Sequence, residues 1–174
     1  MISRLLTIVA FIATLTFPSN VASAGENLAS VPAFHLKDLK GKKVHIEKLK
    51  GKVVVISFWA TWCKPCKREL DDLAKIYKNH EKDGFEVLAI ATDGPETFSE
   101  IRGVVKRHRW PFKVLIDKDG AVTSILNPRS ALPYSIYVNR EGLQADQHEG
   151  YSQGDSKKMT EKIMKLLKIT KKEK

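Results

Sequence analysis

The sequence contains very little cysteine, since Cys63 and Cys66 are the only two among 174 residues. One pair cannot build a framework of several disulfides, so the protein is not a miniature domain held together by cross-links. A hydrophobic core must supply its stability instead. Both cysteines lie in one short segment, FWATWCKPCKREL, which runs from Phe58 to Leu70. The pair is therefore free to act as a redox couple, to form part of a metal site or to make a local cross-link.

The sequence also offers no convincing membrane span near its start. The apolar run from Leu5 to Phe17 is well below the roughly 20 residues that a membrane-spanning helix needs. Arg4 precedes this run, and Ala22-Ser23-Ala24 follows it with the small residues that signal peptidase recognises. We therefore expect residues 1–24 to be a cleaved secretory signal rather than a retained anchor. Residues 25–174 would form the mature protein, without stable insertion in a membrane.

Acidic residues are in the minority, with 20 Asp and Glu against 30 Lys and Arg and a formal net charge of +10. The lysines are spread along the chain and are not interleaved with arginines and aromatic residues. We interpret the charge as a solvated basic surface that keeps the protein soluble and weakly favours acidic partners. We expect no nucleic-acid partner. The mature chain of about 150 residues is long enough for one domain with a sizeable core.

The cysteine pair lies between a predicted strand and a predicted helix. The run Val53-Val54-Val55-Ile56, which leads into Phe58 and Trp59, is typical of a strand covered on both faces. After Cys63, apolar residues recur at the spacing of one helical face, which predicts a helix from the cysteines to about Lys82. Pro65 is compatible with the first turn of that helix, where its missing N–H is no loss.

Further apolar runs and periodicities alternate along the rest of the chain. They predict strands at Phe85–Ala91, Phe112–Ile116, Tyr134–Val138 and Leu143–Tyr151, helices through residues 98–108 and 159–167, a short helix or irregular stretch at Ala121–Leu126, and an N-terminal β-hairpin from Ala33–Leu39 and Lys43–Leu49. Strands that alternate with helices and end in a hairpin and a helix predict an α/β fold with three layers, a mixed central sheet flanked by helices.

The position of the CxxC motif favours redox chemistry. At the first turn of a helix, unpaired backbone N–H groups and the helix dipole favour a thiolate at Cys63, and only the thiolate attacks a disulfide. Structural zinc normally needs four ligands, and the five histidines are scattered without ligand spacing. A purely structural disulfide between Cys63 and Cys66 closes a very short loop and adds little stability through loop entropy. The metal and structural readings stay open as weaker alternatives.

The segment VVISFWATWCKPCKREL (residues 54–70), with Leu132-Pro133 far downstream, resembles secreted thioredoxin-like proteins of the TlpA/ResA type. The resemblance covers roughly residues 32–167. It implies a thioredoxin fold with a central βα insertion, here about Thr92 to Phe112. It also implies an enzyme that performs thiol-disulfide exchange in the bacterial periplasm or is secreted, and it implies no cofactor.

The resemblance also assigns roles to individual residues. Cys63 matches the exposed attacking cysteine of the family, and Cys66 matches the buried resolving cysteine. Pro133 matches the cis-proline that lies against the CxxC motif and lets the backbone of Leu132 pair with a bound polypeptide. An isolated X-Pro bond would ordinarily be trans.

The remaining site residues surround the cysteines. Trp62 is expected to line a substrate-docking surface, together with Lys64, Pro65 and Leu132. Trp59 matches an aromatic position of the family and could equally fill the core.

Two polar residues distinguish this chain from cytoplasmic thioredoxins. Ser57 stands where those proteins carry a buried aspartate that moves protons. TlpA/ResA-type proteins instead have a glutamate just after the CxxC motif, and Glu69 fits that position. We expect Glu69 to exchange a proton with Cys66 if it is deeply buried; on the surface it would only favour the start of the helix.

Two other classes share the fold. Peroxiredoxins place a threonine three residues before the reactive cysteine, whereas Thr61 is two before Cys63, so we set this class aside. Copper-handling thioredoxin-like proteins use CxxxC with a distant histidine, and a non-enzymatic metal-binding protein remains the alternative function.

The resemblance favours the reducing direction, because many relatives keep the haem-attachment cysteines of apocytochrome c, or of another periplasmic client, in the thiol form. We therefore expect client proteins with cysteines or disulfides as partners. A reductase in an oxidising compartment also needs a membrane electron donor. We expect the protein itself to be a monomer.

Overall fold

The computed structural model describes residues 28–169. The predicted secretory signal, residues 1–24, and the expected start of the mature protein at Gly25 lie outside the described residues. None of the helices in the described part is long and apolar enough to cross a membrane.

The elements follow the predicted order closely. They are β1 (His35–Asp38), β2 (Lys43–His45), η1 (Ile46–Leu49), β3 (Val53–Trp59), α1 (Lys64–His80), η2 (Glu81–Asp83), β4 (Phe85–Ala91), η3 (Phe98–Glu100), α2 (Ile101–His108), β5 (Lys113–Ile116), α3 (Ala121–Leu126), β6 (Tyr134–Val138), β7 (Gln144–Glu149) and α4 (Asp155–Ile169). The second arm of the N-terminal hairpin is shorter than expected, because the chain turns into the 3-10 helix η1 after β2.

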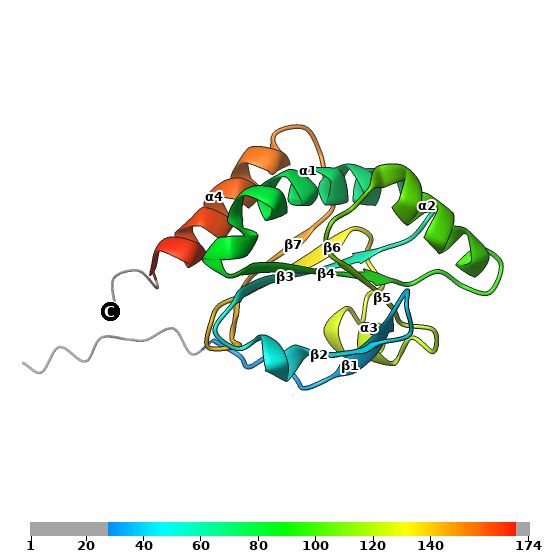
Figure 1. Ribbon diagram of the computed structural model, residues 1–174, viewed down its shortest axis with the longest axis horizontal. Coiled ribbons are helices and arrows are strands. Elements are labelled where there is room, and N and C mark those ends of the chain that lie inside the picture. Colours follow the sequence, from blue (N-terminus) through cyan, green and yellow to red (C-terminus); the bar gives the residue numbers. More distant parts are fainter. Residues whose placement is uncertain (1–27, 170–174) are drawn as a thin grey trace, which may run out of the picture.

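The strands form one mixed sheet of seven, in the order β2-β1-β5-β4-β3-β6-β7. Strand β3 is central: it pairs in parallel with β4 and antiparallel with β6. Helices α1, α2 and α4 cover one face of the sheet, and α3 lies on the other, where the β1–β2 end also curls (Figure 1). This is the expected three-layer α/β arrangement. The range expected for the central insertion, residues 92–112, holds η3 and α2, and the strand that follows it is β5.

Strand β3 is covered on both faces, as its apolar run predicts, and all seven of its residues are buried. Side chains alternate along a strand, so Val53, Val55 and Trp59 join the core cluster under α1 and α4. Val54, Ile56 and Phe58 join the second cluster, on the α3 side. Ser57 has the same parity as Trp59 and therefore faces α1.

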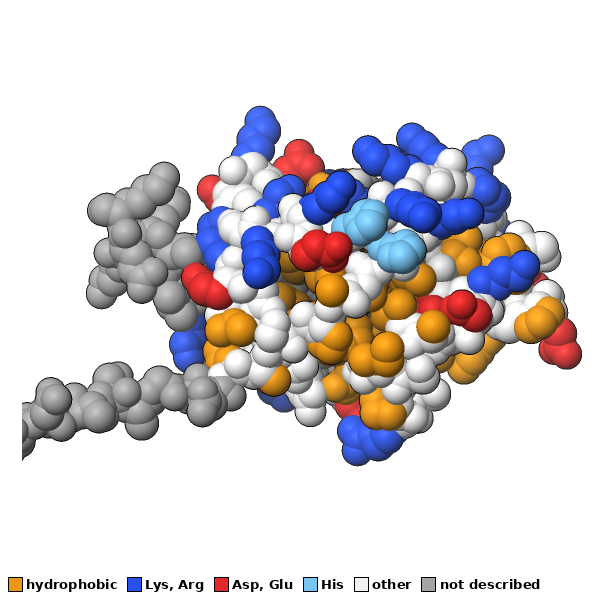
Figure 2. Space-filling view, turned by 90° about the horizontal axis from the view of Figure 1, so that it is seen from below, with side chains coloured by type: hydrophobic (Ala, Val, Ile, Leu, Met, Phe, Trp, Pro, Cys, Tyr) orange, Lys and Arg blue, Asp and Glu red, His pale blue; other side chains and the backbone are white. Residues whose placement is uncertain are grey.

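Basic side chains lie mostly around the upper outline of the face that carries β1, β2 and α3, while hydrophobic side chains are exposed across its middle (Figure 2). Two histidines lie side by side on this face (Figure 2). His35 of β1 and His45 of β2 are stacked, with ring centroids 5.1 Å apart. This end of the sheet is far from β7, the other edge strand.

Candidate active site

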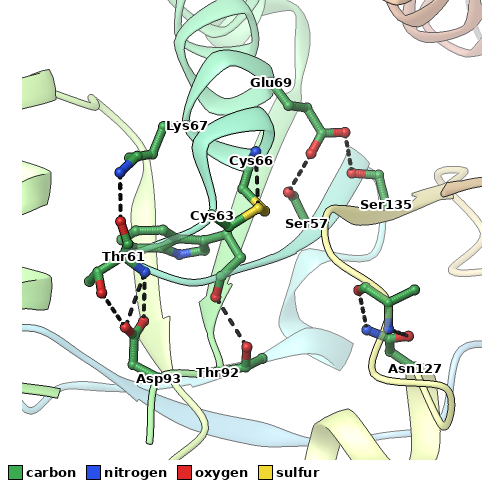
Figure 3. Close-up of a disulfide and its surroundings, with 12 residues drawn as sticks. Ser57, Thr61, Cys63, Cys66, Lys67, Glu69, Thr92, Asp93, Asn127 and Ser135 are labelled. Carbon is green, nitrogen blue, oxygen red and sulfur yellow. Dashed lines mark hydrogen bonds between the residues drawn. A yellow bond between two sulfur atoms is a disulfide. The ribbon is translucent and has the colours of Figure 1, made fainter. Parts of the chain in front are cut away.

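Cys63 and Cys66 form a disulfide at the start of α1 (Figure 3), with their Cα atoms 5.3 Å apart. Cys63 is the N-cap residue, and its Sγ accepts a hydrogen bond from the backbone N–H of Cys66 at 3.2 Å. Pro65 occupies the first turn, as expected. A sulfur at this position receives one of the N–H groups that a helix N-terminus leaves unpaired, which favours negative charge on it.

The two cysteines differ in exposure, but less than expected. Cys63 is only 4% exposed and Cys66 is fully buried. The expectation of an exposed Cys63 is therefore wrong for this oxidised form. Its sulfur lies at the start of the helix, where it is bonded to Cys66 Sγ and accepts a hydrogen bond from the Cys66 N–H. The exposed part of the motif is its flank: Trp62 is 64% exposed and Lys64 is exposed, while Pro65 is half-buried.

Glu69 belongs to α1 and is buried, with only 1% of its surface exposed. The Ser57 hydroxyl donates a hydrogen bond to Glu69 Oε2 at 3.0 Å, and the Ser135 hydroxyl donates one to Oε1 at 2.7 Å. Ser57 of β3 and Ser135 of β6 are directly opposite each other in the sheet. The carboxyl group thus lies over a pair of serines, to one side of the disulfide (Figure 3).

Burial raises the pKa of Glu69 from 4.5 to about 7. The two serine hydroxyls oppose this rise because they hydrogen-bond the ionised form, whereas the negative charge of Asp155 adds to it. Burial is the largest effect, and so of the two outcomes expected for Glu69 the structure gives the buried one. A carboxyl with such a pKa can take or give a proton near neutral pH.

A second buried carboxylate, which the sequence analysis did not identify, holds the turn before the cysteines. Asp93, two residues after the end of β4, accepts hydrogen bonds from the Thr61 hydroxyl at 2.5 Å and from the Thr61 N–H at 3.0 Å (Figure 3). It also accepts one from the Thr97 hydroxyl at 2.8 Å. Because β3 and β4 are parallel, their carboxyl ends meet at one edge of the sheet, and this placement could have identified Asp93. The Thr61 hydroxyl is directed to Asp93 and not to a sulfur.

The Leu132-Pro133 bond is cis, as expected. Leu132 is half-buried and packs against both core clusters, whereas Pro133 is buried. The loop before this bond is held by Asn127, whose side chain donates to the carbonyl of Ala131 and accepts from its N–H. The backbone that precedes the proline is therefore fixed from within the loop.

Trp59 belongs to the core and not to the surface of the site. It is fully buried and meets Trp110 edge to face, with ring centroids 4.9 Å apart. Within residues 28–169, no group of three or more His, Cys, Asp or Glu side chains is placed to hold a metal ion. The structure thus brings the disulfide and a buried carboxyl together at one helix, with Trp62 exposed beside them. Such a site can exchange disulfides and store one proton.

Comparisons with known proteins agree with this geometry. The family model of AhpC/TSA matches residues 29–143. The "Thiol-disulfide oxidoreductase ResA" of Halalkalibacterium halodurans is 33% identical over 159 residues, which cover 88% of this chain and 85% of that protein. A crystal structure from Chlorobium tepidum, described as a thiol:disulfide interchange protein DsbE, is 26% identical and covers 80% of this chain and 96% of that one, with a TM-score of 0.74. A secreted Mycobacterium tuberculosis disulfide oxidoreductase, 20% identical, shares the fold with a TM-score of 0.66 over 76% of this chain and 96% of its own.

Proposed function

Because the chain belongs to the AhpC/TSA family and is a thiol-disulfide oxidoreductase similar to ResA, we propose that it reduces disulfides of client proteins outside the cytoplasm. The observation that carries this proposal is the buried Glu69 carboxyl on the same helix as the cysteine pair. A membrane electron donor recharges the enzyme, which acts as a monomer.

The reaction begins when the Cys63 thiolate attacks one sulfur of a client disulfide. A mixed disulfide forms, and the other client sulfur leaves as a thiolate that takes a proton from water. Cys66 then gives its thiol proton to the Glu69 carboxylate and attacks Cys63 Sγ. This closes the Cys63–Cys66 disulfide and releases the second client thiolate, so the client gains the two electrons that the enzyme's dithiol loses.

The client is held beside the sulfurs during these steps. The exposed ring of Trp62 offers an apolar surface next to Cys63, with Lys64 and Pro65 at its side. The backbone of Leu132, before the cis-proline Pro133, pairs with an extended segment of the client.

Glu69 supports the reducing direction. DsbA is a strong oxidant because its reduced form is stabilised, and its attacking cysteine has a very low pKa. Here Glu69 follows Cys66 by three residues on α1, and its carboxyl group lies to one side of the disulfide (Figure 3). A negative charge there disfavours a second negative charge on a thiolate. The reduced pair is therefore less stabilised than in DsbA, and it gives up electrons more readily.

The direction is tested by the reduction potential of the Cys63/Cys66 pair, measured in defined glutathione or dithiothreitol buffers. We expect a value below about −200 mV, on the side of thioredoxin at about −270 mV. A value near the −120 mV of DsbA would make the protein an oxidant and overturn the proposed direction.

For the client we propose apocytochrome c or another exported protein whose cysteines must stay reduced, on the strength of the resemblance to TlpA/ResA-type proteins. A peptide with an oxidised CxxCH motif should be reduced faster than a matched peptide whose two cysteines are far apart. Equal rates would leave the enzyme without preference for haem-attachment sites.

The N-terminal pattern supports the proposed location. The apolar run and the sequence Ala22-Ser23-Ala24 support export and cleavage after Ala24. The mass of the protein recovered from the periplasm or medium should correspond to a chain that starts at Gly25. An uncleaved chain held in the membrane fraction would contradict this.

A further inference from the structure

A row of three polar side chains crosses the sheet below Glu69. Ser57 on β3 is opposite Ser135 on β6, and Ser135 is in turn opposite His148 on β7. Residues directly opposite each other on neighbouring strands point to the same face, with Cβ atoms about 4.5–5.5 Å apart. Glu69 lies on the two serines, and the row continues past them to the edge strand.

The side chain of His148 is partly buried and partly exposed. It is 31% exposed, yet its Nε2 atom is buried and has no hydrogen-bond partner among the described residues. Asp155 Oδ2 lies 3.7 Å from Nε2, which is too far for a hydrogen bond. An unpaired ring nitrogen of this kind can share a proton with a water molecule inside the fold.

A small cavity connects Glu69 with His148. Its volume is about 20 Å³, and the side chains of both residues line it, together with Tyr137, Tyr151 and Asp155. A cavity of this size has room for one water molecule, and several polar residues line this one. One water can therefore bridge the carboxyl of Glu69 and the ring of His148.

The other groups around the cavity are poorly suited to carrying a proton. Burial raises the pKa values of Tyr137 and Tyr151, so both phenols stay neutral near neutral pH. The hydroxyl and N–H of Ser152 hold the pKa of Asp155 well below its usual range, so this group stays ionised. An imidazole, in contrast, accepts and releases protons in the neutral range.

Two lysines of α4 also line the cavity, and each is paired with a carboxylate. Lys158 Nζ is 3.3 Å from Asp155 Oδ1, and Lys162 Nζ is 2.7 Å from Asp146 Oδ2. These pairs hold charge near the cavity but do not offer a free base. His148 remains as the lining residue that can both take and give a proton.

We propose that His148 carries protons between Glu69 and solvent, through one water in the cavity. The proposal rests on the proposed role of Glu69. During resolution the carboxylate of Glu69 takes the thiol proton of Cys66, so Glu69 must be ionised before this step. Because Glu69 is 1% exposed, a proton that it already holds needs a path to solvent. The proton moves to the water, the water gives a proton to Nε2 of His148, and the ring releases one to solvent from its exposed side. A proton that returns to Glu69 from solvent follows the same path inwards.

The first test is a ¹³C NMR titration of the Glu69 side-chain carboxyl in the oxidised protein. In the wild type its shift should show a second inflection that depends on His148, because two ionisable groups that share one water interact and their titrations are coupled. His148→Gln should leave one inflection. His45→Gln, which removes a histidine from β2 at the opposite edge of the sheet, should leave both.

The second test is stopped-flow resolution of the mixed disulfide at low buffer concentration, started by a jump from about pH 5 to about pH 8, so that Glu69 must first lose a proton to solvent. We expect His148→Gln to slow this step about 10- to 100-fold, up to the lower limit for a positioned acid–base group. His148→Ala opens a space at the same place, and added imidazole should restore its rate. High concentrations of a small buffer should also narrow the gap to the wild type.

The outcomes separate this inference from the proposed function. A wild-type rate for His148→Gln, with Glu69→Gln slow in the same assay, would overturn the relay and leave the proposed function standing. A shared inflection without any change of rate would make His148 an electrostatic neighbour and would also overturn it. Slowing that imidazole does not restore, with a lowered melting temperature, would mean a structural role for His148.

Discussion

The two faces of strands β3 and β6 bury different kinds of side chain. On the α3 side, Ile56 and Phe58 of β3 and Ile136 of β6 lie in an apolar cluster. On the α1 side, the same strands present Ser57 and Ser135, and both serines donate to the buried carboxyl of Glu69. One pair of strands therefore has an apolar face and a face with a titratable group under the redox pair.

The two kinds of buried side chain have opposite effects on the stability of the fold. A fully buried aliphatic side chain such as Ile56 stabilises the fold by about 1.5–3 kcal/mol. A buried carboxylate does the opposite, and its raised pKa records the cost of the charge. Because alternate residues of a strand point to opposite faces, Ser57 lies on the side of the titratable group, whereas its neighbours Ile56 and Phe58 lie in the apolar cluster on the other side. Substitutions on the two faces should therefore have separable effects.

The largest effect is expected from the cysteines, which lie on the side of the sheet that carries the two serines. Cys66→Ser should lose turnover and accumulate mixed disulfides through Cys63, because attack begins at the sulfur that caps the helix. Cys63→Ser should also lose turnover but trap no client. Non-reducing gels with a model disulfide protein measure both, and the double variant is the control. Equal trapping by the two single variants would contradict the assignment.

On the apolar face, Ile56→Ala should lower the free energy of unfolding by about 2–5 kcal/mol, because it leaves a cavity at a fully buried position. The rate of disulfide exchange per folded molecule should not change. Urea unfolding and stopped-flow exchange measure the two quantities. Ile125→Ala, at a residue that is 63% exposed, should change stability by less than about 0.5 kcal/mol. A changed exchange rate in Ile56→Ala would break the separation of the faces.

Glu69→Gln should remove a dependence of stability on pH. The pKa of Glu69 is raised from 4.5 to about 7 in the folded protein, so between these values the folded state holds a proton that the unfolded state has lost. Its contribution is complete below about pH 4.5 and is lost as the pH rises through about 7, for a total of ~3 kcal/mol. Denaturation of the oxidised protein from pH 4 to 8 should show this slope in the wild type and a flatter one in the variant.

The same variant should keep the fold but slow resolution of the mixed disulfide and flatten its pH-rate profile between about pH 5 and 8. The wild-type rate should rise with pH through about 7, as Glu69 loses its proton and becomes a base. An unchanged profile for Glu69→Gln would remove the proton-carrier role. The flattening of the stability curve would still stand, since it depends on burial alone.

The smallest effect is expected from the serines. Ser135→Ala removes a hydrogen bond that favours the ionised Glu69, so the midpoint of the pH-rate profile should move up by about one pH unit or less. Ser57→Ala should move it less, because its bond is longer, at 3.0 Å against 2.7 Å. Ser124→Ala on the surface of α3 is the control. A downward shift would contradict the role of the two hydroxyls.

Local pattern was enough to predict most of the fold. The apolar run from Val53 to Trp59 predicted a strand covered on both faces, and the spacing of apolar residues after Cys63 predicted α1. These features depend on neighbours in the chain. The cis bond before Pro133 was expected only from the resemblance to a family, because an isolated X-Pro bond carries no such signal.

The partners of Glu69 could not be predicted, because they depend on strand register. Ser57 and Ser135 are 78 residues apart and meet only because β3 and β6 pair with those two positions opposite each other. A weak signal existed, since each serine interrupts an otherwise apolar or aromatic strand. His148 was set aside as one of several scattered histidines, and only the pairing of β6 with β7 brings it into line with Ser135.

The bond network around Asp93 has a consequence for protein engineering. Asp93 lies in the segment that was expected as a family-specific insertion, yet it holds the N–H and the hydroxyl of Thr61, two residues before Cys63. A designer who trims residues 92–112 to obtain a smaller redox module would therefore remove the support of the active-site turn along with the helix. The shortest useful scaffold must retain Asp93, or supply another acceptor for Thr61 from a shorter loop.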